Sequence, residues 1–189
     1  MHERRVNYVL NKTTKVGNLK GVDITKGSTG PNAKGPDTSP SLLLATGVAV
    51  SGKMALNTVY LVTSLKDAQD TLGITAAYDT ANACVLHEHI SEFYRMTGDG
   101  TKLWLMVVTV AAASPAALLE DTGALYAKKL IIAANGEARQ LGFAFNVAAD
   151  YTETQTDGLN TQIRAAISKA QFLADWSFAN DMGVHIFLE

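Results

Sequence analysis

Residues 102–110, Lys-Leu-Trp-Leu-Met-Val-Val-Thr-Val, decide the fold, because almost every side chain in them is apolar. The apolar run that contains them, residues 103–113, is shorter than the ~20 residues that a membrane-spanning helix needs. A strand without polar alternation requires cover on both faces, which a parallel sheet between two helical layers provides. The stretch therefore predicts a central strand of an α/β domain.

Outward from this strand, segments with strand character alternate with segments of helical periodicity. Residues 59–63 and 141–147 are predicted to be further central strands, and residues 41–50 and 184–188 also have strand character. This alternation predicts an α/β fold with a mainly parallel or mixed central sheet flanked by helices over residues 41–189.

Capping residues and apolar spacing place the predicted helices. Ser64 is expected to cap a short helix that Gly73 ends, and Ser114-Pro115 to start a helical region that runs to about Asn135. Two longer helices are predicted from apolar faces: residues 80–96, with Ala83, Leu86, Ile90 and Phe93, and a helix capped by Asp157 and ended by Gly183, with Leu159, Ile163, Ile167, Ala170 and Ala174.

Residues 1–40 differ from the rest of the chain and are predicted to form an extended arm. They contain five glycines and three prolines, and turn-forming residues dominate residues 25–41. Residues 6–10 and 19–25 have strand character but cannot bury themselves alone, so they need a sheet edge to pair with. We expect this arm to contact other subunits through Val6, Tyr8, Leu19, Val22 and Ile24.

Charge is unevenly distributed between the arm and the body. Residues 1–35 carry seven basic and two acidic side chains, a charge of +5. The net charge of the chain is −2, so the remaining residues carry −7. A basic arm fits nucleic-acid binding, but only Tyr8 is present among the basic residues to stack on a base. It also fits docking on an acidic surface such as another copy, or an ordinary solvated tail.

Cysteine content and the N-terminus give limited information about the compartment. The single cysteine, Cys84, excludes an internal disulfide and is expected to be a small core residue in a helix. No apolar segment follows residues 1–5, so no secretory signal is recognised.

Residues 47–54, Gly-Val-Ala-Val-Ser-Gly-Lys-Met, nearly match a phosphate-binding P-loop. The eighth position of that motif must carry a hydroxyl that binds magnesium, and here it is Met54. The following residues also lead toward a strand rather than a phosphate-binding helix. We therefore expect no nucleotide at this loop.

No other motif predicts catalysis, a cofactor or a metal. His87 and His89 lie two residues apart, about 200° around a helix, so they cannot share one ion. His2 and His185 have no partner motif, and the carboxylates of Asp67, Asp70, Asp99, Glu120 and Asp150 are scattered over predicted caps and turns. Residues 150–152, Asp-Tyr-Thr, follow a predicted strand and are the best remaining place for a ligand site.

Several segments, taken in order, resemble the tail sheath proteins of contractile phages and prophages of the Mu-like or Bacteroides-type branch. They are VYLVTSLKDA at residues 59–68, HISEFYR at 89–95, GDG at 98–100 followed by LWLM, AKKL at 127–130, ANGEAR at 134–139, YT at 151–152 with DGL at 157–159, and the stretch from KAQ at 169–171 to residue 189. No single segment is specific, and the resemblance rests on their order over residues 45–189.

This resemblance implies a structural protein rather than an enzyme. It implies an arm of residues 1–40, a sheath-like α/β domain of residues 41–189, and a C-terminal part that this chain lacks. The implied partners are other copies in a helical polymer and the tail tube protein, with no membrane or nucleic acid; the implied location is the virion tail, assembled in the host cytoplasm. The alternatives are a small α/β nucleotide- or ligand-binding enzyme domain and a nucleic-acid-binding module that uses the basic arm.

Overall fold

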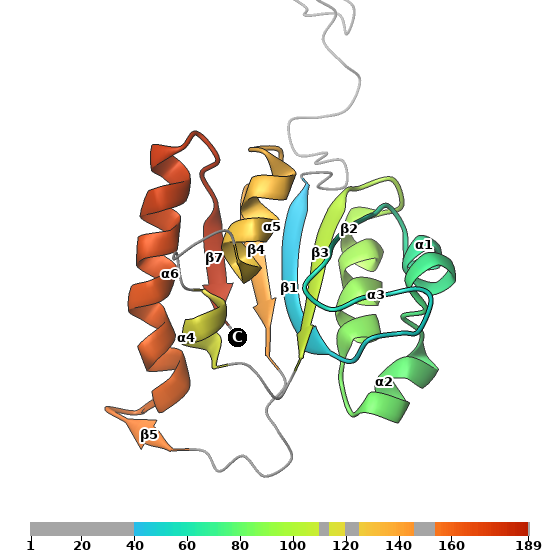
Figure 1. Ribbon diagram of the computed structural model, residues 1–189, viewed down its shortest axis with the longest axis horizontal. Helices are drawn as coiled ribbons and strands as arrows, with labels where there is room; N and C mark the ends of the chain where they lie inside the picture. Colours follow the sequence, from blue (N-terminus) through green and yellow to red (C-terminus); the bar gives the residue numbers. More distant parts are fainter. Residues whose placement is uncertain (1–39, 110–113, 120–124, 146–153, 189) are drawn as a thin grey trace, which may run out of the picture. The chain divides into compact units, whose positions relative to one another are not determined.

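The computed structural model describes residues 40–109, 114–119, 125–145 and 154–188 (Figure 1). The predicted arm, with Val6, Tyr8, Leu19, Val22 and Ile24, lies outside these residues. The arm and its predicted boundary at residues 40 and 41 therefore stay predictions.

The centre of the domain is a five-stranded mixed sheet with the order β2-β3-β1-β4-β7. The strands are β1 (Ser41–Gly47), β2 (Val59–Val62), β3 (Leu103–Thr109), β4 (Gln140–Ala144) and β7 (His185–Leu188). β2 is antiparallel to β3, and all other pairs are parallel. The predicted mainly parallel or mixed sheet with flanking helices is confirmed.

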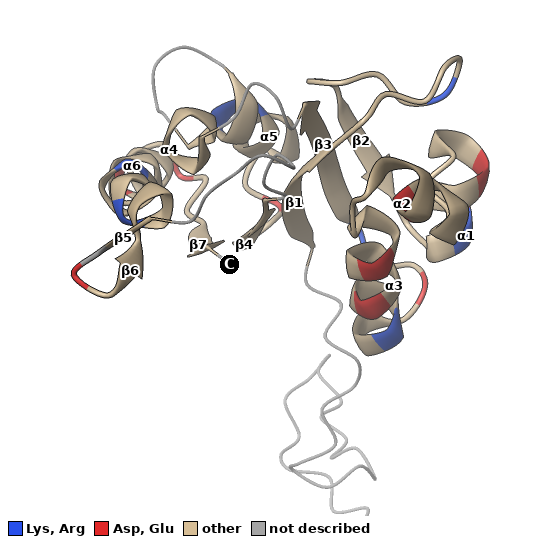
Figure 2. Ribbon diagram, turned by 90° about the horizontal axis from the view of Figure 1, so that it is seen from below, with Lys and Arg blue, Asp and Glu red and all other residues tan. Residues whose placement is uncertain are grey.

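Helices lie on both faces of the sheet, as Figures 1 and 2 show. One layer, here named the α6 face, holds α4 (Pro115–Leu118), α5 (Tyr126–Ala134) and α6 (Thr161–Ala179). The other, the α3 face, holds α1 (Leu65–Asp67), the π-helical segment η1 (Ala68–Leu72), α2 (Ala76–Asn82) and α3 (Leu86–Thr97). A small hairpin of β5 (Gln155–Thr156) and β6 (Leu159–Asn160) precedes α6. No helix of the described segments has the length and apolar character needed to cross a membrane.

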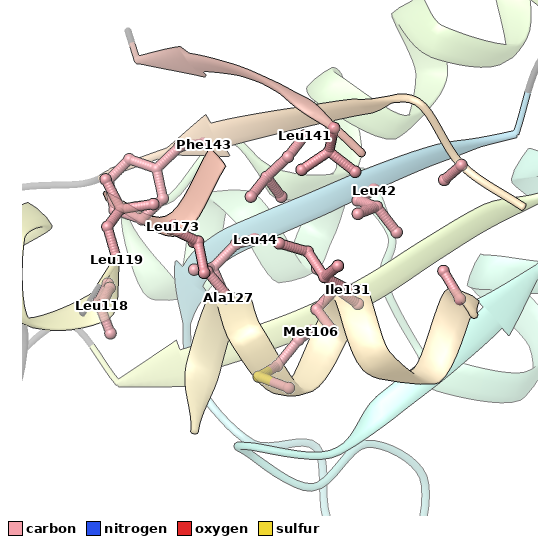
Figure 3. Close-up of a cluster of buried hydrophobic side chains, with 14 of the residues drawn as sticks. Leu42, Leu44, Met106, Leu118, Leu119, Ala127, Ile131, Leu141, Phe143 and Leu173 are labelled. Atoms are coloured by element: carbon pink, nitrogen blue, oxygen red, sulfur yellow. The ribbon is translucent and has the colours of Figure 1, made fainter. Parts of the chain in front are cut away.

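Alternate side chains of each central strand enter two separate cores. On the α6 face, Leu44 and Met106 pack with side chains of α4, α5 and α6, as Figure 3 shows for this cluster. On the α3 face, Leu105 packs with Leu86 and Ile90 of α3. Because β3 contributes buried side chains to both cores, its predicted cover on both faces is confirmed.

Most predicted helix boundaries are confirmed by their caps. The Ser64 hydroxyl accepts from the Asp67 N–H at 2.9 Å, and the Ser114 hydroxyl accepts from the Ala117 N–H at 3.2 Å. Gly73 ends η1 with φ 75°, a left-handed conformation that glycine adopts without strain.

The predicted central position of residues 59–63 is wrong. Among the described strands β2 lies at the edge of the sheet and pairs with β3 alone, and Leu61 is 41% exposed. A short apolar strand can have the same composition at the edge of a sheet as at its centre. Composition therefore did not distinguish an edge position from a central one.

The predicted helix over residues 80–96 is two helices. Ala83 adopts φ 48° and ends α2, and the Asp79 carboxylate then caps α3 by accepting from the N–H groups of His87 and Glu88. Cys84 is buried as predicted but lies in the turn between the helices. Burial raises the pKa of its thiol to about 11, so the thiol stays protonated at neutral pH.

The predicted cap of α6 is wrong, and the predicted apolar face is not the most buried one. Asn160 caps the helix, whereas Asp157, with φ 54°, and Gly158 form the turn between β5 and β6. The buried residues are Ala166, Leu173 and Ser177. The predicted face, Leu159, Ile163, Ile167, Ala170 and Ala174, lies beside the buried one and is partly open: Ile167 is 47% exposed.

Replacing Leu44 with alanine tests the packing of the central strand. Leu44 is fully buried, so the Leu44→Ala cavity should lower the free energy of unfolding by about 2–5 kcal/mol. The matched control, Leu61→Ala on the edge strand β2, should cost less than about 1.5 kcal/mol, because Leu61 is 41% exposed. Urea denaturation of both variants measures the difference, and equal losses would contradict the assigned sheet order.

Candidate functional site

The loop that follows the carboxyl end of β1 is a candidate ligand site, because α/β proteins bind ligands at the carboxyl ends of parallel strands. In this loop Val50 and Met54 form a two-residue bridge: the Val50 N–H donates to the Met54 carbonyl at 2.8 Å, and the Met54 N–H donates back at 2.9 Å. Residues 51–53 form the tight turn between them, with φ 71° at Gly52. The loop is therefore a small hairpin and not the start of a helix.

A buried tyrosine holds the first residues of this loop in place. The Tyr78 hydroxyl of α2 accepts from the Val48 N–H at 2.8 Å and donates to the Val48 carbonyl at 2.7 Å. Burial raises the pKa of Tyr78, so the hydroxyl remains a donor at neutral pH. A Cβ on Gly47 would lie 2.7 Å from this hydroxyl, which explains the glycine. The Val48 amide that a phosphate would need is thus already bonded.

The remaining positions of the P-loop-like segment also have structural roles. The Met54 side chain is 1% exposed and packs in the α3-face core, where a hydroxyl could not reach a metal ion. The Lys53 ammonium donates to the Asp70 carbonyl at 2.9 Å. These contacts favour the interpretation of residues 47–54 as a structural turn.

The two neighbouring histidines contact different elements. His87 Nε2 lies 3.1 Å from Nε2 of Gln69 in η1, whereas His89 lines a shallow hollow beside the sheet. His185 lies in β7 against the Phe178 ring. Within residues 40–109, 114–119, 125–145 and 154–188, no three His, Cys, Asp or Glu side chains are grouped to hold a metal ion.

The carboxylates of Asp67 and Asp70 are a capping group and an ion-paired group. The Asp67 carboxylate accepts from the Thr63 N–H at 3.1 Å and from the Thr71 hydroxyl at 2.6 Å, and Asp70 pairs with Lys66 at 2.6 Å. Glu120, Asp150, and the Asp-Tyr-Thr segment at residues 150–152, lie outside the described residues, so the ligand site expected there stays untested.

The open edge of β7 is the strongest candidate for a functional surface. β7 pairs with β4 on one side, and no strand of the described segments lies on its other side. Its side chains alternate in burial: Ile186 and Leu188 pack against the α6-face core, and His185 and Phe187 are exposed. Phe187 is 58% exposed, so this edge is apolar and uncovered.

A groove of about 540 Å³ runs along this edge between β7 and α6. Its α6 wall includes Ile167, Ala170, Ala174 and Phe178, and Phe178 is 56% exposed. Three residues of the apolar face predicted for this helix, Ile167, Ala170 and Ala174, therefore line the groove. The helix carries two adjacent apolar faces, of which only one is covered by its own sheet.

A second hollow, of about 240 Å³, lies on the α3 face of the same edge. Leu43, Gly142 and Phe187 are register partners across β1, β4 and β7, and His89 and Phe93 of α3 complete the wall. A Cβ on Gly142 would lie no closer than 3.8 Å to any atom beyond its chain neighbours, so the absence of a side chain at Gly142 leaves space in the hollow. Apolar space therefore flanks β7 on both faces.

Sequence reasoning placed the interaction residues in the arm and missed those of the edge. Ile167 was identified only as part of the apolar face of a helix, and Phe178 and Phe187 were not singled out. The sequence contained a sign of this surface. Phe172, Phe178 and Phe187 are large apolar residues outside the apolar faces predicted for their segments, and all three are exposed.

The described part is a mixed α/β domain whose candidate site is an apolar sheet edge. The chain belongs to the family described as DUF2586, N-terminal domain, whose model matches residues 19–178. Comparison with curated proteins and with solved structures gave no match. The family description names a domain and no activity.

Removing the Tyr78 hydroxyl tests its role in holding the loop after β1. Tyr78→Phe should lower the free energy of unfolding by about 1–3 kcal/mol, because the Val48 N–H and carbonyl both lose their buried partner. Tyr60→Phe is the matched control: its hydroxyl accepts one exposed bond from Ala55, and its loss should cost less than about 1 kcal/mol. Denaturant unfolding compares the two, and a larger loss for Tyr60→Phe would contradict the assigned role.

Titration calorimetry with magnesium and ATP tests the P-loop-like segment directly. We expect no micromolar binding, because Met54 is buried and Tyr78 already bonds the Val48 amide. Micromolar binding that disappears in Lys53→Ala would show that residues 47–54 do hold a nucleotide.

Proposed function

We propose that this chain is the N-terminal portion of the sheath subunit of a contractile phage tail, a structural protein that polymerises around the tail tube and contracts. The ordered similarity over residues 45–189 supports the family, and the open β7 edge supports assembly. This edge is the single structural observation that carries the proposal.

The space beside β7 suits one added strand. A strand paired with β7 bonds through its backbone, and its alternating side chains enter the groove on one face and the hollow on the other. The α6 wall of the groove, with Ile167 and Phe178, would cover the apolar side of that strand. Strand addition therefore accounts for the groove between β7 and α6 with one partner.

The arm of a neighbouring copy is the proposed donor of that strand. Residues 19–25, Leu-Lys-Gly-Val-Asp-Ile-Thr, place Val22 and Ile24 on one side and Asp23 and Thr25 on the other. The basic arm also complements the acidic remainder of the chain, but exposed pairs contribute only ~0–1 kcal/mol each. Strand pairing and the burial of Val22 and Ile24 carry most of the interaction.

Electron microscopy of the full-length protein tests this function. Tubes should form, and deleting residues 1–26 should abolish them while the melting temperature of the body stays nearly unchanged. Val22→Asp combined with Ile24→Asp should also abolish tubes, because two charges would enter an apolar groove. Asp23→Ala combined with Thr25→Ala is the matched control and should leave tubes intact.

Three outcomes would count against the proposal. The full-length protein could form no tubes, tubes could persist after the deletion, or the deletion could unfold the body. The last result would place the arm in the core of its own domain.

A further inference from the structure

The second apolar face of α6 is a continuous stripe. Ile163, Ile167, Ala170, Ala174 and Phe178 follow one another at intervals of three or four residues, so they lie along one side of the helix. We name these five residues the α6 stripe. Ile167 and Phe178 remain about half exposed, which leaves large apolar side chains in contact with solvent.

The β7 edge next to the stripe lacks the lysine and proline that often prevent pairing with other molecules. Natural edge strands are protected by lysine, proline or a bulge. β7 consists of His185, Ile186, Phe187 and Leu188 and contains neither lysine nor proline. Four residues of the stripe, Ile167, Ala170, Ala174 and Phe178, line the groove together with β7.

We propose that two copies of this chain pair in solution about a two-fold axis, with their α6 stripes packed antiparallel. The shape of the stripe favours this partner. Its centre holds the small residues Ala170 and Ala174, which allow two helices to approach closely, and larger side chains lie toward its ends. In an antiparallel pair, Ile163 and Ile167 of each copy lie toward the Phe178 end of the other.

The charges beside the stripe are complementary in the same arrangement. Arg164 precedes Ala170 by six residues and Asp175 follows it by five, on the same side of the helix. Antiparallel pairing about Ala170 therefore places Arg164 of each copy opposite Asp175 of the other. In the single chain, Arg164 forms an ion pair with Asp157 at 2.9 Å. Both side chains are exposed, so the Arg164 guanidinium is accessible to a second carboxylate.

The pairing goes beyond the proposed function and does not depend on it. A symmetric pair is a closed assembly, because each copy uses the same patch and no free patch remains. Such a pair would cover both β7 edges at once. Where the chain also builds a polymer, this pair would hold free subunits apart from it until an incoming strand displaces the second copy.

Sedimentation equilibrium of the 189-residue chain tests the pairing. The wild-type mass should rise from 20.1 kDa toward twice that value as concentration increases. Ile167→Lys should weaken the pair at least tenfold, because it places a charge in the centre of the interface. The matched control is Ile132→Lys on α5, 41% exposed and outside the groove, which should leave the pair unchanged. Circular dichroism confirms that both variants fold.

A charge exchange separates this geometry from unspecific apolar association. Arg164→Asp and Asp175→Arg should each weaken the pair, and the double variant should restore it, because each aspartate then faces an arginine. A monomer at about 100 µM would mean a Kd too weak for this interface and would overturn the inference. Equal effects of Ile167→Lys and Ile132→Lys would also overturn it. A third result would overturn it too: deletion of residues 1–26 abolishes association and Ile167→Lys leaves it intact. The arm would then be responsible for the association.

Discussion

Burial of β3 on both faces is the constraint from which the other features of the domain follow. Leu105 and Met106 are adjacent and fully buried, yet they point to opposite faces of the sheet. Each apolar side chain buried in this way contributes about 1.5–3 kcal/mol, which is lost if either face is open to water. Helices must therefore cover both faces at β3, and the segments before and after β3 supply one layer each.

The same arrangement explains why the far side of the sheet is incomplete. The segments that lead from β3 to β4 and from β4 to β7 place α4, α5 and α6 on one face only. On the opposite face, α3 reaches β1 but leaves the hollow above Gly142, and Phe187 is exposed beyond it. β7 lies at the border of the described sheet, yet three of its four residues, Ile186, Phe187 and Leu188, are large and apolar.

Sequence predicted those parts of the fold that depend on local rules. The strand at 103–109 and the caps at Ser64 and Ser114 follow from composition and from single side-chain bonds. The break at Ala83 was missed because alanine rarely adopts positive φ, and the long-range partner of the break, Asp79 capping α3, is invisible to periodicity. The arm residues stay a prediction, and the β7 edge could not be located before the strand order was known.

The two apolar faces of α6 link this limit to function. Periodicity correctly identified an apolar stripe through Ile163 and Ile167, but a stripe does not state what covers it. Its own sheet covers the neighbouring face, with Leu173, and the described residues leave the stripe partly open to solvent. In the assembly that we propose, the exposed apolar surface at the sheet edge would bind its partner through backbone pairing and burial, while Tyr78 holds the loop after β1 in place.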